Sequence, residues 1–175
     1  WFDGRPHINR SISYGLLLVL GRWPDFWPVV FVQSALTIWI FALTLRAHRL
    51  GGRPLLLLAT ITALSVLTTL PWLTAILLTD IFAGLGVLAL YLLLLRDDAL
   101  SNRERIGLIV FVGASAATHS ATRAVLSGLV LVATIVWLVD KPRIPSGRLL
   151  RAWAALLFGA LIVLTTNALI TGRPG

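Results

Sequence analysis

One apolar stretch decides the fold, Pro54-LLLLATITALSVLTTLPWLTAILLTDIFAGLGVLALYLLL-Leu95, which holds a single charged residue, Asp80. As one helix it would extend about 60 Å at 1.5 Å per residue, twice the thickness of the hydrocarbon core of a bilayer. The chain must therefore turn back, and Pro71 and Asp80 interrupt the apolar run. We expect one span near 55–70, a turn at 71–79 and a second span near 80–95.

Composition agrees with a membrane protein. The chain has 175 residues, of which 58% are hydrophobic and 13% are charged. Soluble domains carry roughly 25% charged residues. Apolar runs close to the length of a bilayer span recur along the chain, so we predict an all-α, polytopic helical membrane protein. Its lipid-facing surface implies membrane lipids as partners.

The remaining spans follow from the same reasoning. A short interfacial helix is expected at 11–20, followed by a first span at 27–45. The last span is expected at 149–169. The block 106–139 is too long for one span and breaks at 118–123, which predicts a hairpin of two short helices. The chain is thus one transmembrane domain, 1–175, with an outer segment at 1–26, membrane spans at 27–169, and about six spans or half-spans.

Charge gives the orientation. The connections 46–53, 96–105 and 140–148, together with Arg151 just after the last of them, carry ten of the fifteen Lys and Arg residues. The positive-inside rule places these connections in the cytoplasm. The net charge of +8 is then a matter of topology, and no nucleic acid is expected as a partner. We expect the connection 96–105 to be solvated throughout.

In this topology a set of polar residues gathers on the outer face of the membrane. Ionisable residues at membrane depth are costly and usually face an interior cavity. The candidate site residues are Asp3, Arg5, His7, Arg10, Asp80, His119 and Arg123. The same topology places Asn167 near this face of the membrane.

Four of these candidates, Asp3, Arg5, Arg10 and Asp80, have a structural alternative. Asp3 and Arg5 can be ordinary loop charges around a glycine turn. Arg10 can be an interfacial residue whose long side chain reaches the headgroups. Asp80 can be the N-cap of the helix that follows it.

The later candidates differ from one another in whether structure alone explains them. His119 and Arg123 are four residues apart, so on a helix they share a face, and packing explains such a pair poorly. Asn167 has a simpler explanation in hydrogen bonding between helices.

The chemistry of this set points to a lipid-linked phosphate. A carboxylate beside an acceptor group can act as a general base, and Arg with His can hold a phosphate. An apolar flank between spans would take the lipid tail. The chain has no Cys, which excludes thiolate chemistry, and it lacks the GxSxG, HExxH and P-loop motifs. No metal ligand set is predicted.

The arrangement resembles the GT-C superfamily of membrane glycosyltransferases. The resemblance lies in an early acidic residue in a first outer loop (Asp3), a short helix at 11–20, an acidic span start (Asp80) and a hairpin tip at 119–123. More narrowly, three short motifs are similar to those of bacterial multi-span proteins of uncharacterised function. They are Asp3-Gly4-Arg5, Thr79-Asp80-Ile81-Phe82-Ala83-Gly84-Leu85 and Ser101-Asn102-Arg103-Glu104-Arg105.

This resemblance implies a multi-pass protein of the bacterial inner (cytoplasmic) membrane that transfers a sugar from a polyprenyl-phosphate donor at the outer, periplasmic face. It implies Asp3 as the base, Asp80 in support of it, and His119 and Arg123 near the donor phosphate. Some members of the superfamily need a divalent metal. The chain departs from the pattern because its first loop has one acidic residue instead of an adjacent pair.

Two other readings stay open. The chain can be a non-catalytic accessory or structural subunit of a larger membrane complex. A transporter fits less well, since no span centre carries paired charges and no inverted repeat is evident. Because the sequence has no Met and opens at Trp1, we expect it to be an internal part of a longer protein.

Overall fold

The computed structural model describes residues 14–15, 18–19, 21, 25–75, 79–140 and 144–171, and in these ranges every regular element is a helix. This confirms the all-α prediction. The helices with described bounds are α2 (Trp27–Ala47), α3 (Pro54–Leu67), α4 (Leu70–Ala75), α5 (Asp80–Leu95), the 3₁₀ turn η1 (Asp97–Ala99), α6 (Asn102–Thr118), α7 (Ser120–Val139) and α8 (Ser146–Thr171).

Three helices in the described ranges are long and apolar enough to cross a membrane, namely Trp27–Ala47, Ser120–Val139 and Ser146–Leu169. The structure thus agrees with a membrane protein of several spans, but the six expected spans are not confirmed. The apolar helices α3 and α5 have 14 and 16 residues. At 1.5 Å per residue, 16 residues reach only about 24 Å.

The long apolar block folds back almost where the sequence predicted. The second helix runs from Asp80 to Leu95, as expected. The predicted turn at 71–79 instead contains the short helix α4. Pro71 explains the earlier break, because a proline ring clashes with the carbonyl four residues before it, and that residue is Leu67, the last of α3.

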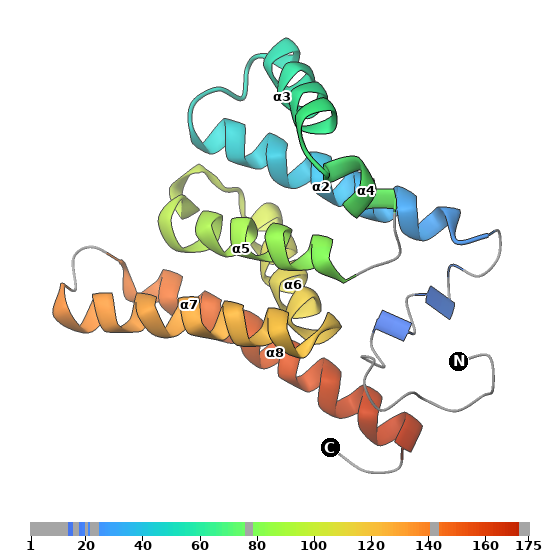
Figure 1. The fold of residues 1–175 in the computed structure, drawn as a ribbon. Helices are drawn as coiled ribbons and strands as arrows, with labels where there is room; N and C mark the ends of the chain where they lie inside the picture. Colours follow the sequence, from blue (N-terminus) through green and yellow to red (C-terminus); the bar gives the residue numbers. More distant parts are fainter. Residues whose placement is uncertain are drawn as a thin grey trace.

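The helix bundle has two opposite ends, at which successive helices are connected (Figure 1). Arg46, near the end of α2, pairs with Glu104 at the start of α6, and Arg148 and Arg151 at the start of α8 pair with Asp98 and Asp97. We call this the charged end; the connections α2–α3, α5–α6 and α7–α8 lie there. At the opposite end α2 and α5 begin and α6 turns into α7.

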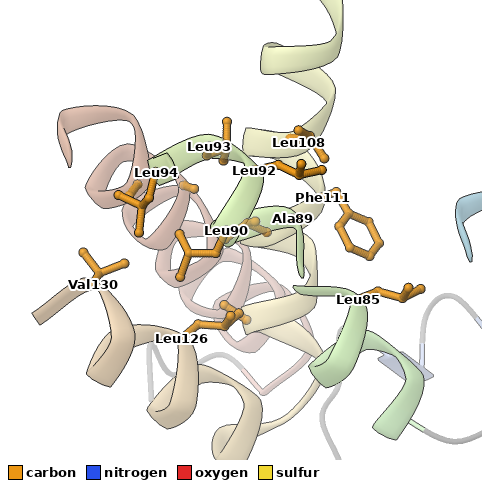
Figure 2. Packing of buried hydrophobic residues seen from close by; sticks show 14 of the residues in the cluster. Leu85, Ala89, Leu90, Leu92, Leu93, Leu94, Leu108, Phe111, Leu126 and Val130 are labelled. Atoms are coloured by element: carbon orange, nitrogen blue, oxygen red, sulfur yellow. The ribbon is translucent and has the colours of Figure 1, made fainter. Parts of the chain in front are cut away.

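The core surrounds α5, whose side chains are buried on several faces (Figure 2). Figure 2 shows its leucines packed against Leu108 and Phe111 of α6 and against Leu126 and Val130 of α7. By contrast, α3 has no buried residue and contacts mainly α2 and α4. A helix that is apolar all round is expected to be buried, and α5 fits this pattern at the centre of the bundle.

Two glycines let α6 and α8 approach closely. A Cβ at Gly113 would lie 2.7 Å from the carbonyl oxygen of Ala155, and one at Gly159 would lie 2.6 Å from the carbonyl oxygen of Gly113. Such contacts between backbones are typical of helices packed through small residues. The helix pair therefore depends on the absence of side chains at these two positions.

Candidate functional site

The structure describes three of the predicted site residues, Asp80, His119 and Arg123. The other four, Asp3, Arg5, His7 and Arg10, lie outside the described residues, and so does most of the expected interfacial helix at 11–20. The three described residues lie at the end of the bundle opposite the charged end.

His119 forms the break between α6 and α7, as the sequence predicted. Its backbone is extended, with φ −153° and ψ 144°, and its Nδ1 accepts a hydrogen bond of 3.1 Å from the backbone N–H of Ala121. His119 is thus the N-cap of α7, a position where a side-chain acceptor stabilises the first turn. Because Nδ1 accepts, the ring proton of the neutral imidazole sits on Nε2, on an exposed side chain.

Arg123 links α7 back to the last turn of α6. Its Nε donates to the carbonyl oxygen of Ala116 at 3.3 Å, and its backbone N–H donates to the carbonyl oxygen of His119 at 3.0 Å. The first of these bonds satisfies a carbonyl that the end of α6 leaves without a helical partner. Within the described ranges, the two terminal amino groups of the half-buried guanidinium make no hydrogen bond.

These contacts correct part of the reasoning from sequence. His119 lies at the N-cap, so the two residues do not share a face within one helix. Packing also explains both of them, since one caps α7 and the other ties α7 to α6. Each residue still presents hydrogen-bond donors away from its structural contact, at the positively polarised start of a helix of 20 residues.

Asp80 is the first residue of α5 and is exposed. Thr79 occupies the N-cap position, and no side chain caps this helix with a hydrogen bond. The capping alternative for Asp80 is therefore wrong. A carboxylate in the first turn is nevertheless favoured by the helix dipole.

Asp80, His119 and Arg123 lie at the same end of the bundle. α5 and α6 are joined by a short connection at the charged end and pack against each other, so the start of α5 and the end of α6 both face the opposite way (Figure 1). Tyr14 also lies at this end of the bundle. Its buried ring packs edge-on against Phe82 of α5, with 6.1 Å between the ring centroids. The chain that precedes α2 thus contacts α5 two residues from Asp80.

The reading of the connection 96–105 as solvated throughout is wrong. Asp97 is 7% exposed, and its two carboxylate oxygens accept hydrogen bonds from Arg105 Nε at 2.7 Å and Arg151 Nη1 at 2.6 Å. Burial by itself would raise the pKa of the Asp97 carboxyl, but the two guanidinium groups outweigh it and hold that pKa below its usual value.

Two further ion pairs complete the charged end. Glu104 accepts from Arg46 at 2.5 Å and also closes a capping box with Ser101 at the start of α6. Its hydrogen bond from Arg46 lowers the pKa of Glu104 to about 2, despite the opposing effect of burial. Asp98 pairs with Arg148 of α8. These pairs connect four helical elements, so the charged end is a structural clamp.

The clamp left only a weak signal in the sequence. The charges within 96–105 do not reveal their partners, because two of the partner arginines come from α8, about fifty residues away. Within the described ranges no group of three or more His, Asp or Glu residues is placed to hold a metal ion.

Comparison with known proteins adds no assignment: no protein family, no curated protein and no solved structure matches this chain.

Proposed function

We propose that this chain is a membrane glycosyltransferase that binds a polyprenyl-phosphate sugar at the end of the bundle where α6 turns into α7. The observation that carries the proposal is the hydrogen bonding of His119 and Arg123. Each residue is fixed by one bond to the backbone, and each keeps donors that face no described partner. Donors held in place without a local acceptor are suited to a phosphate, which offers several acceptor oxygens.

The start of α7 strengthens such a site. The first backbone N–H groups of a helix have no partner within it, and His119 satisfies only that of Ala121. A phosphate near this turn would therefore meet a positive helix end, an imidazole N–H and a guanidinium. The apolar, exposed side chains farther along α7, among them Leu129 and Leu131, offer a surface for the polyprenyl tail.

The acceptor half of the proposed reaction belongs to the acidic residues. Asp3 would take the proton of the acceptor hydroxyl, whose oxygen forms the new bond to the sugar carbon as the lipid phosphate leaves. Tyr14 on Phe82 supports this proposal, because it brings the chain that follows Asp3 to the α5 turn that begins with Asp80. We propose that this end faces the periplasm and the charged end faces the cytoplasm of a bacterium, in line with the positive-inside rule.

The test separates phosphate binding from turnover. Purified protein in nanodiscs is titrated with a polyprenyl phosphate, and sugar release is measured with a panel of polyprenyl-phosphate sugars. Losing one charge-assisted contact costs roughly 1.5–3 kcal/mol, so Arg123→Gln should weaken binding about 10- to 100-fold. The matched control is Arg103→Gln, an exposed arginine of the charged end.

Asp3→Asn should abolish turnover and leave polyprenyl-phosphate binding intact. Equal binding by wild type and Arg123→Gln would remove the proposed phosphate site. Full turnover in Asp3→Asn would remove the proposed base. These two failures are distinct, because the first concerns the α6–α7 turn and the second the N-terminal segment.

One observation favours the alternative of an accessory subunit. α3 buries no residue; its last residue, Leu67, is 80% exposed, and Trp72 of the neighbouring α4 is 68% exposed. Such a surface suits either lipid or the helices of a partner protein. The subunit proposal predicts a defined partner on purification from native membranes in mild detergent, retained in Asp3→Asn. Release of that partner by Trp72→Ala would support it, and a monodisperse single chain would refute it.

A further inference from the structure

A separate cavity lies at the charged end, between the last turn of α2 and the first turn of α3. Its volume is about 250 Å³. It is lined by side chains of the two helices, Ala42, Leu45 and Leu57, which we call the apolar wall, and by the turn residues Gly51, Gly52 and Arg53, which we call the rim. An apolar wall with a cationic rim is the combination expected where a lipid tail meets its headgroup.

The turn between the two helices shapes this rim. Arg49 adopts a left-handed conformation with φ 63°, and the N–H of Leu50 donates to the carbonyl oxygen of Leu45 at 2.8 Å, which closes the end of α2. The chain then folds back so tightly that a Cβ at Gly51 would lie 2.6 Å from Cβ of Arg46. This places Arg53, immediately before α3, in the lining of the cavity.

The charge of Arg53 has no counterpart within the described ranges. Four other arginines of the charged end, Arg46, Arg105, Arg148 and Arg151, each pair with a carboxylate. Arg53 is exposed and forms no ion pair there. An unpaired cation beside an apolar cavity favours an anion that brings its own apolar body.

The place of the cavity identifies that anion. It lies at the end of the candidate span Trp27–Ala47, where lipid headgroups would meet the protein. Beside the cavity, Leu55 and Leu58 of α3 are 78% and 62% exposed on the outer surface of the bundle. We propose that this cavity binds an anionic phospholipid, with Arg53 on the headgroup phosphate and the acyl chain along the apolar wall. Basic pockets between membrane helices recognise anionic headgroups in this way.

The test is a lipid titration followed by native mass spectrometry. Purified protein in detergent is titrated with phosphatidylglycerol or with phosphatidylcholine, whose headgroup has no net charge. One arginine near a membrane surface adds about 1 kcal/mol of attraction, so wild type should retain phosphatidylglycerol about fivefold more tightly. Arg53→Gln should remove this preference, and Arg103→Gln, the matched exposed arginine, should keep it.

A second variant tests the wall without changing charge. Ala42→Phe fills the cavity and should weaken both lipids, with the helical content by circular dichroism unchanged. The proposal is overturned if wild type holds the two lipids equally, or if Arg103→Gln loses the preference as Arg53→Gln does. Displacement of phosphatidylglycerol by millimolar inorganic phosphate would also overturn it, because the cavity would then bind a free anion. None of these outcomes depends on the proposed transferase activity.

Discussion

Replacing Asp97 with asparagine tests the clamp at the charged end most directly. The substitution keeps the shape of the side chain and removes the charge that two guanidinium groups share. The Asp97 side chain is 10% exposed, and those of Arg105 and Arg151 are 20% and 35% exposed. After the change both arginines face a neutral amide in a largely buried position.

The expected cost follows from this burial. Breaking a fully buried ion pair costs about 3–5 kcal/mol, whereas an exposed pair contributes about 0–1 kcal/mol. Because Arg151 is partly exposed, water recovers some of its solvation, and we expect Asp97→Asn to cost about 2–3 kcal/mol. Asp98 is the matched control: it also pairs with one arginine of α8, but its side chain is 70% exposed. Asp98→Asn should cost under about 1 kcal/mol.

The assay is reversible unfolding in mixed micelles at rising mole fractions of dodecyl sulfate, followed by circular dichroism. The free energy of unfolding of Asp97→Asn is compared with that of Asp98→Asn and of wild type. A second comparison adds Asp97→Asn to an Arg151→Gln background, where the cost should shrink because one stranded charge is gone. Equal costs for Asp97→Asn and Asp98→Asn would refute the claim that burial makes the first pair structural.

Two further predictions concern stability. The free energy of unfolding should fall as pH drops from about 4.5 towards about 2. The folded state holds the pKa of Glu104 below its unfolded value, and the stabilisation that this provides is lost when Glu104 is protonated. Glu104→Gln should therefore flatten that part of the pH profile. Gly159→Leu should cost about 1–3 kcal/mol or more by forcing α6 and α8 apart. Gly128→Ala, where a Cβ meets nothing within 4 Å, should be neutral or stabilising in the same unfolding assay.

Local breaks in the helices could be predicted from the sequence because they depend on neighbouring residues. The bounds of α5 and the interruption at His119 follow from where the apolar pattern is broken. The split between α3 and α4 depends on Pro71 acting four residues upstream, which was expected as a turn and not as a second helix. Local signals therefore locate helices to within a turn, but they do not count the spans.

The burial of Asp97 could not be predicted in this way. Its sequence neighbours are charged or polar, as in a solvated loop, and only the packing of α8 against that loop brings Arg151 onto it. Gln33 poses the same difficulty on α2, since an isolated amide in an apolar run gives no sign that the folded chain leaves it 1% exposed. For Asp97 the contact with α8 decides the burial, and no periodicity within 96–105 records that contact.

The carboxylates at the two ends of the bundle are partnered differently, and this difference supports a functional role for the end at which α6 turns into α7. At the charged end, Asp97, Asp98 and Glu104 are each matched to an arginine. At the opposite end, Asp80 and Arg123 form no ion pair within the described ranges.

A protein that needed polar residues only for folding would gain by pairing them, because unpaired charge near lipid is costly. Donors that are fixed in place and left without an acceptor are what a site for an anionic ligand requires before the ligand arrives. The α6–α7 turn is therefore where binding experiments should begin, with the clamp residues at the charged end as controls for stability alone.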